Sequence, residues 1–150
     1  MPLSQFAAVG DASGMATYDE LQIGDSATFT KTVSETDIYM FAGITGDMNP
    51  AHVDAVSAAE GMFKQRIAHG MLSASFISTV IAMKLPGPGT IYAGQNLQFR
   101  APVFIGDTVT AKVEVSEMLD ARKWVKMKTT VTNQDGKLVV DGEATVIPPK

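Results

Sequence analysis

The sequence contains no cysteine, which excludes disulfide bonds, thiol nucleophiles and thiolate metal sites. Only two of its 150 residues are histidines, which argues against a histidine-rich metal centre. Charged residues make up only 19% of the chain, and the net charge of −4 argues against nucleic acid or an anionic membrane as the main partner. Hydrophobic residues, at 45%, lie in the range of a single soluble globular domain.

The chain also lacks a recognisable targeting segment. Its first residues, MPLSQFAAVGDASGM, have neither the basic region nor the long apolar region of a signal peptide. We interpret residues 1–16 as a flexible leader and residues 17–150 as one domain. The longest apolar stretch, residues 71–85, contains serines and a lysine and is shorter than the roughly 20 residues that cross a bilayer. We therefore expect a cytoplasmic protein without a membrane partner.

The first half of the domain begins with a strand and a helix. Residues 27–33 (ATFTKTV) are rich in threonine, valine and phenylalanine, which is typical of a strand. Ser34 follows with Asp37 three residues later, the spacing of a capping box that begins a helix. We expect Gly43 to end this helix.

Two further helices are predicted before the chain changes character. Asn49 as N-cap and Pro50 at the first helical position begin a helix that is expected to continue through HVDAVSAAEGMF. A helix of about four turns is predicted over MLSASFISTVIAMKL, between Gly70 and Pro86. Because this segment is apolar or small on nearly every side, we expect it to be buried all round.

The second half of the chain has the period of strands. Hydrophobic and polar residues alternate, as in TVTAKVEV, and Gly106-Asp107 and Asp135-Gly136 supply turns. Helices followed by long antiparallel strands predict an α+β fold in which a curved sheet covers one central helix. The predicted strands are residues 91–99, 108–117, 122–132 and 138–147.

A polar cluster, GDMNPAH, lies where a loop meets a helix. Asp47 and His52 in this cluster form a natural general acid and base pair, because their ordinary pKa values of about 3.9 and 6.5 suit them to opposite roles near neutral pH. The alternative is that Asp47 is a turn residue, Asn49 a simple N-cap and His52 a surface histidine. The spacing alone does not choose between the two.

The pair His69-Gly70 precedes the predicted central helix. The first turn of a helix leaves backbone N–H groups without partners, and glycine allows a ligand to approach them closely. Gly70 is therefore a candidate donor to a developing oxyanion, and a plain turn glycine is the alternative. Ser75, one turn further, either orients a catalytic carboxylate or bonds the carbonyl of Met71.

Three stretches of the chain resemble the MaoC-like, or hydratase-2, family. They are FAGITGDMNPAHVD, RIAHGMLSAS and IYAGQNLQFRAPVFIGDTVTAKVEV, and the resemblance covers residues 17–147. It is closest to the (R)-specific enoyl-CoA hydratases of bacterial polyhydroxyalkanoate metabolism. The resemblance implies a hot-dog fold, an antiparallel sheet wrapped around one long helix, and a homodimer.

The resemblance also implies a role for each candidate residue. Asp47 and His52 match the family's catalytic pair, which holds and activates a water. Asn49 matches the asparagine of the motif, with a positioning role, and Gly70 matches the glycine whose amide binds the thioester oxygen. Ser75 matches a serine that hydrogen-bonds the catalytic aspartate in close relatives.

These roles imply hydration of a trans-2-enoyl-CoA to the (3R)-3-hydroxyacyl-CoA, and the reverse dehydration, with no metal or other cofactor. An acyl-CoA thioesterase and a non-catalytic acyl-CoA-binding module are the alternatives, since one fold hosts several functions. Met62 and Met71 are candidates for the wall of an acyl tunnel, with a place in the core as the alternative. The CoA phosphates call for a local basic patch, and the candidates are Lys64, Arg66, Lys84, Arg100 and Lys123.

Overall fold

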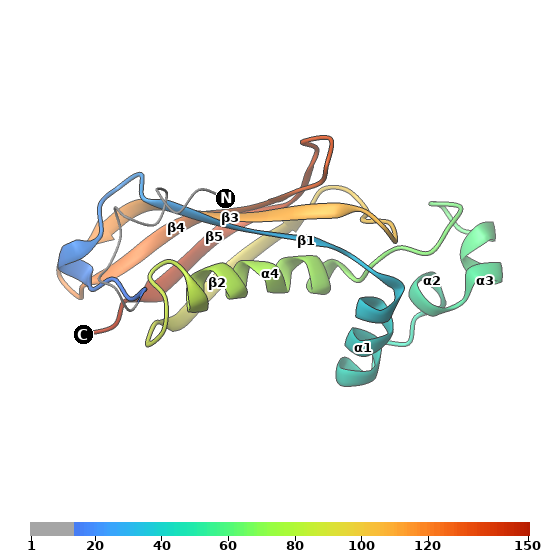
Figure 1. The fold of residues 1–150 in the computed structure, drawn as a ribbon, viewed down its shortest axis with the longest axis horizontal. Helices are drawn as coiled ribbons and strands as arrows, with labels where there is room; N and C mark the ends of the chain where they lie inside the picture. The colour runs from blue at the N-terminus through green and yellow to red at the C-terminus, as the bar shows by residue number, and fades with distance from the viewer. Residues whose placement is uncertain (1–13) are drawn as a thin grey trace.

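The computed structural model describes residues 14–150 and contains a five-stranded antiparallel sheet in the order β1-β3-β4-β5-β2. The long helix α4 lies along one face of this sheet, and the small helices α1 to α3 lie beyond one end of it (Figure 1). A sheet that covers one central helix is the arrangement predicted from the residues, and it is the hot-dog fold that the family resemblance implies. The elements are a 3-10 turn at Tyr18–Glu20, β1 (Ser26–Thr32), α1 (Glu35–Thr45), α2 (Pro50–Val53), α3 (Ala55–Glu60), α4 (Gly70–Met83), β2 (Ile91–Phe99), β3 (Thr108–Leu119), β4 (Trp124–Thr132) and β5 (Leu138–Ile147).

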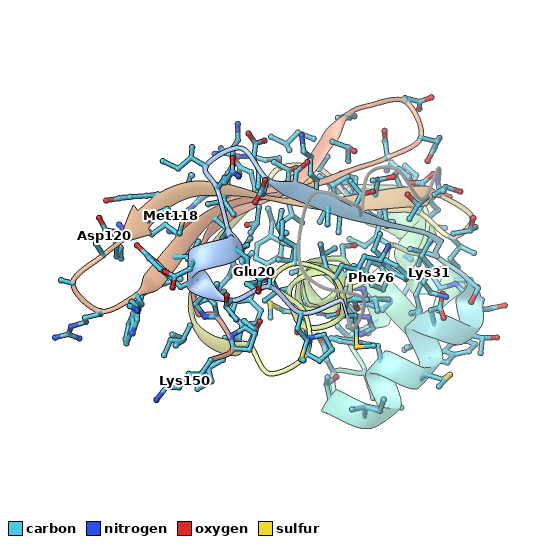
Figure 2. All side chains as sticks on the ribbon, turned by 60° about the vertical axis from the view of Figure 1, so that its left-hand side comes forward. Glu20, Lys31, Phe76, Met118, Asp120 and Lys150 are labelled. Carbon is cyan, nitrogen blue, oxygen red and sulfur yellow. The ribbon has the colours of Figure 1, made fainter. Side chains whose placement is uncertain are left out.

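The strands follow their sequence pattern because alternate side chains face the helix. In β3, the inward residues from Val109 to Val115 are at most 1% exposed, as the alternation predicts. They pack with Ile77, Val80 and Ile81 of α4 in a single core. Side chains fill the space between the helix and the curved sheet (Figure 2). Complete burial of each large aliphatic side chain contributes about 1.5–3 kcal/mol.

The central helix is not buried on every side, and that prediction was wrong. Met71 and Met83 are 55% and 64% exposed, and Ser75, Ser78 and Ala82 on the same side are also exposed. The spacing of these residues places them on one stripe of the helix. The sheet of one chain covers the opposite side of α4 only, so the apolar and small residues of this stripe are left outside the core.

The predicted helix after Pro50 is divided into two short helices. Asp54, between them, has φ −116° and ψ 102°, and its carboxylate accepts hydrogen bonds from the N–H groups of Val56 and Ser57. A side chain that caps a new helix at this point ends the preceding one. The prediction of one continuous helix was therefore wrong, whereas the N-cap at Asn49 is confirmed by its bond to Ala51 N–H.

Helix α1 ends at Gly46 and not at Gly43. Its capping box between Ser34 and Asp37 is confirmed. Gly43 lies within the helix, and the left-handed residue that ends it is Gly46, with φ 81°. Gly46 thereby turns the chain directly before Asp47.

The two glycines give a matched test of this assignment by chemical denaturation. Neither glycine has a neighbour within 4 Å of an added Cβ, so only the backbone conformation differs between them. We expect Gly46→Ala to destabilise the protein by about 1–2 kcal/mol, because a side chain disfavours the left-handed region. Gly43→Ala should stabilise it by roughly 0.5–1 kcal/mol. Equal effects of the two substitutions would contradict the assigned helix end.

Residues 1–13 of the expected leader lie outside the described residues. Ala16, also assigned to the leader, is only 1% exposed, and its N–H donates to the carbonyl of Pro86 at 2.8 Å. The packed part of the chain therefore begins before Thr17. No helix in the part of the chain that the structure describes has the length and apolar character needed to span a membrane.

Candidate active site

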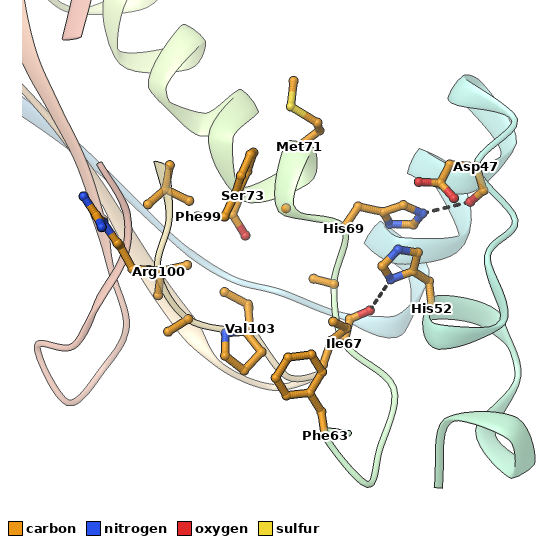
Figure 3. Close-up of a pocket in the computed structure, with 16 residues that line it drawn as sticks. Asp47, His52, Phe63, Ile67, His69, Met71, Ser73, Phe99, Arg100 and Val103 are labelled. Carbon is orange, nitrogen blue, oxygen red and sulfur yellow. Dashed lines mark hydrogen bonds between the residues drawn. The ribbon is translucent and has the colours of Figure 1, made fainter. Parts of the chain in front are cut away.

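The loop between α1 and α2 holds Asp47 in a defined turn. The N–H of Asp47 donates to the hydroxyl of Thr45 at 3.2 Å, and its carboxylate accepts the N–H of Asn49 at 3.2 Å. The residue remains exposed, and its side chain lies at the wall of a cavity (Figure 3). Asp47 therefore has both a fixed position and access to a bound molecule.

His52, on α2, is half-buried and has a defined tautomer. Its Nδ1 lies 2.7 Å from the carbonyl oxygen of Ile67. Because a carbonyl only accepts, Nδ1 carries the proton of this bond. In the neutral ring, Nε2 then has a free lone pair and can accept a proton from water.

The structure brings Asp47 and His52 together, as the motif predicts, and adds a third residue. A carboxylate oxygen of Asp47 and one ring nitrogen each of His52 and His69 all lie within 4.8 Å of one another. The imidazole rings of His52 and His69 are stacked, with centroids 3.8 Å apart (Figure 3). This cluster can exchange protons with a small molecule, and its three atoms are also of types that bind metal ions.

Gly70 begins α4 on the wall of the same cavity. Within residues 14–150, its N–H has no hydrogen-bond acceptor, as expected for the first position of a helix. A Cβ at this position would lie 2.7 Å from Cδ1 of Phe99, so any larger residue must displace that ring. A residue whose backbone N–H has no acceptor within the described residues thus lines the same cavity as Asp47 and His52, where the family resemblance implies an oxyanion-binding group.

Two other predicted site residues do not line this cavity in the described part of the chain. The side chain of Asn49 caps α2 through Ala51 N–H at 3.0 Å, and Asn49 lines a separate cavity of about 340 Å³. The hydroxyl of Ser75 donates to the carbonyl of Leu72 at 2.5 Å. The acceptor is thus Leu72, not Met71 or the carboxylate of Asp47. The capping role of Asn49 matches the alternative considered from sequence.

The cavity has a volume of about 510 Å³ and largely apolar walls, typical of a small-molecule site. Two buried polar residues on its wall, His69 at 2% and Ser73 at 1% exposure, have no role assigned from the sequence. His69 directly precedes Gly70 as the N-cap residue of α4, and Ser73 lies within the helix, so their closeness to the candidate Gly70 is the signal that was available. The apolar residues of the wall are Phe63, Ile67, Ala68, Met71, Phe99, Ala101, Pro102, Val103, Val139 and Val140.

The two candidate tunnel methionines lie in different places. Met71 lines the cavity described above, whereas Met62 lines the separate cavity next to α2 and α3. They are 55% and 84% exposed, so the alternative placement of these residues in the core was wrong.

Of the five candidate basic residues, Arg100 alone lines the cavity among the described residues. Lys123 lies in the turn after β3, where Leu119 pairs with Trp124 at the opposite end of the sheet. The ammonium of Lys84 donates to the carbonyl of Thr28 at 2.6 Å. Lys64 is exposed in the segment after α3.

Arg66 is engaged by an acidic partner. It donates to the carboxylate of Glu35 at 2.6 Å and to the hydroxyl of Tyr39 at 2.8 Å. The hydrogen bond from Arg66 lowers the pKa of Glu35, and a second one from Tyr39 adds to the effect. Arg100 is therefore the basic residue best placed to meet a bound anion, although it too is paired, with Asp141 at 3.0 Å.

Comparison with known proteins shows the family of the chain. The family model described as MaoC like domain matches residues 20–137. The chain belongs to the MaoC-like domain family. It is 54% identical over 132 residues to an (R)-specific enoyl-CoA hydratase of Rhodospirillum rubrum. The aligned region covers 88% of this chain and 91% of that relative.

Solved structures of MaoC-like relatives share the fold. An R-hydratase of Pseudomonas aeruginosa in the unliganded form is 51% identical with a TM-score of 0.85, over 89% of this chain and 86% of the other. An (R)-hydratase of Aeromonas caviae involved in PHA biosynthesis is 41% identical with a TM-score of 0.84, over 86% of this chain and 98% of the other. The resemblance seen in the sequence is thus confirmed across nearly the whole MaoC-like domain.

Proposed function

We propose that the protein is an (R)-specific enoyl-CoA hydratase, which adds water to trans-2-enoyl-CoA and catalyses the reverse dehydration. One observation carries this proposal: Asp47, His52 and Gly70 line one cavity, and the Gly70 N–H has no acceptor within the described residues. Hydration of a conjugated thioester requires a general acid–base pair and a backbone hydrogen-bond donor at the same cavity. The (R)-specific hydratases at 54% and 41% identity support the same reaction.

In the proposed mechanism, the thioester oxygen accepts a hydrogen bond from Gly70 N–H, which draws electrons from the conjugated double bond. The Asp47 carboxylate and the Nε2 of His52 hold a water molecule near C3. The pair takes one proton from the water as its oxygen bonds to C3, and an enolate forms on the thioester oxygen. The same pair returns a proton to C2, so the overall change is the addition of one water molecule.

The chemistry proposed here needs no metal or other cofactor, because the thioester itself carries the enolate charge and Gly70 N–H stabilises it. The grouping of Asp47, His52 and His69 makes this worth testing directly. We expect hydration to survive dialysis against a chelator without loss, whereas an essential metal would make the activity depend on added ions.

The activity is tested by following the loss of enoyl-thioester absorbance from crotonyl-CoA and from a longer enoyl-CoA. We expect loss of absorbance without release of free thiol. Release of free CoA thiol would instead favour the thioesterase alternative. Binding of both substrates without turnover would favour the non-catalytic module.

We further propose that the protein acts as a cytoplasmic homodimer. The exposed stripe of α4 and the edge strand β2 leave apolar side chains uncovered, among them Ile91 at 59% and Phe99 at 54% exposure. An edge strand with such residues favours pairing with a second strand. Analytical ultracentrifugation should give twice the chain mass of 15.9 kDa.

Arg100 is proposed to bind a phosphate of CoA. Its side chain is 52% exposed at the cavity, so we expect Arg100→Gln to raise KM for crotonyl-CoA about tenfold at low salt and to leave kcat unchanged. Lys123→Gln, at the far end of the sheet, is the matched control and should leave KM unchanged. Crotonyl-pantetheine, which lacks the nucleotide phosphates, should show no difference between Arg100→Gln and the wild type. A tenfold change with that substrate as well would contradict the phosphate contact.

A further inference from the structure

His69 is a buried polar residue to which the proposed mechanism gives no role. It is 2% exposed and occupies the N-cap position of α4, but its side chain makes no capping hydrogen bond there. An N-cap side chain ordinarily accepts a hydrogen bond from the first turn of its helix. The ring of His69 is instead directed away from its own helix and toward α1 and α2 (Figure 3).

The ring of His69 holds the catalytic loop through its backbone. Its Nε2 lies 2.9 Å from the carbonyl oxygen of Asp47. Because that oxygen only accepts, Nε2 carries the proton of this bond. The Asp47 peptide, in a loop between two helices, is thereby connected to the first turn of α4, where Gly70 lies.

The same ring also supports His52. It stacks on the imidazole of His52, with ring centroids 3.8 Å apart and 29° between the ring planes. Its centroid also lies 4.9 Å from that of the Phe41 ring on α1. The two histidines hold their protons on opposite nitrogens, since His52 donates from Nδ1 and His69 from Nε2. The Nδ1 of His69 has no partner within the described residues.

We infer that His69 is a positioning residue for the proposed hydratase reaction, which fixes Asp47 and His52 relative to each other and to Gly70. One donor nitrogen holds the Asp47 peptide, and the face of the same ring sets the orientation of His52. A displacement of about 1 Å at a catalytic group can lower a rate about 100-fold, so this double contact has a measurable effect on turnover. The inference rests on the proposed function.

Two substitutions separate the two contacts. His69→Phe retains a stacking ring and removes the donor, whereas His69→Gln places an amide donor near Nε2 and removes the stack. We expect kcat for crotonyl-CoA to fall about 100-fold in His69→Phe and about tenfold in His69→Gln, with KM within about twofold of the wild type in both. Ile77→Val, buried in the same helix, is the control for destabilisation alone and should keep the wild-type kcat.

Nuclear magnetic resonance tests the contacts without relying on activity or on the folding of a variant. Since the chain has only two histidines, ¹⁵N-labelled histidine gives two assignable rings. At a pH where both rings are neutral, we expect His52 as the Nδ1–H tautomer and His69 as the Nε2–H tautomer.

The outcomes distinguish the inference from the function on which it rests. An inactive wild-type protein would overturn the proposed hydratase function itself. If the wild type is active, the positioning role alone is overturned by either of two results. One is that both rings have the same tautomer, and the other is that a folded His69→Phe protein keeps the wild-type kcat. A rise in KM with unchanged kcat would also overturn it, because it would show a substrate contact and not a positioning role.

Discussion

Replacing Asp47 by asparagine should lower kcat for enoyl-CoA hydration by about 1,000-fold, which lies within the range for removal of a general base. The amide has the shape of the carboxylate, and its oxygen can still accept the N–H of Asn49. The carbonyl of Asp47 also remains available to His69. The substitution therefore removes the proton acceptor and leaves the turn in place. Steady-state kinetics with crotonyl-CoA measure the effect.

A control must show that loss of a carboxylate elsewhere on this surface does not itself lower activity. Asp54 is likewise an exposed carboxylate that accepts backbone N–H groups, and Asp54→Asn retains an oxygen for the N–H groups of Val56 and Ser57, so it should keep wild-type kinetics. The melting temperature of Asp47→Asn should stay close to that of the wild type. If a folded Asp47→Asn protein turned over at the wild-type rate, the carboxylate could not be the base.

The second large effect is expected at Gly70. In Gly70→Ala, the new Cβ would lie 2.7 and 2.8 Å from two carbons of the Phe99 ring, which is closer than such atoms approach. Phe99 is 54% exposed and can move, but its ring lines the cavity into which the thioester must bring its oxygen. We expect kcat/KM to fall about 100-fold, comparable with the loss of one oxyanion donor. Kinetics with crotonyl-CoA measure the loss.

A double substitution tests the stated cause. Phe99→Ala removes the atoms that the new Cβ would meet, so Gly70→Ala should cost far less in a Phe99→Ala background than in the wild type. Gly61→Ala offers a comparison outside the cavity, since its added Cβ would lie 3.4 Å from the Ala58 carbonyl oxygen. If the loss at Gly70 were the same in both backgrounds, contact with Phe99 would not be its cause.

Much of the fold was predictable because its signals are local. Strands β2 to β5 were found within two residues at each end, since side-chain alternation and turn residues mark them directly. The exposed stripe of α4 was not predictable in this way, because it depends on how far around the helix the sheet reaches. Asp54 was taken for a helical residue, although its short acidic side chain also fits an N-cap.

The site was predictable only in part for the same reason. Asp47 and His52 are five residues apart, so one motif contains both, and Gly70 follows from its place at the start of a helix. The contact between His69 and the Asp47 carbonyl joins residues 22 apart and depends on how α4 meets the loop. The absence of a contact from Ser75 to Asp47 within the described chain likewise depends on which side of α4 faces the cavity.

The most direct test of the proposed reaction is the configuration of the product. Crotonyl-CoA is incubated with the wild-type protein, and the product is offered separately to (R)-specific and (S)-specific 3-hydroxyacyl-CoA dehydrogenases. We predict that the (R)-specific enzyme alone oxidises it, and that Asp47→Asn forms almost none. A product oxidised by the (S)-specific enzyme, or no product from short and long enoyl-CoA substrates alike, would contradict the account.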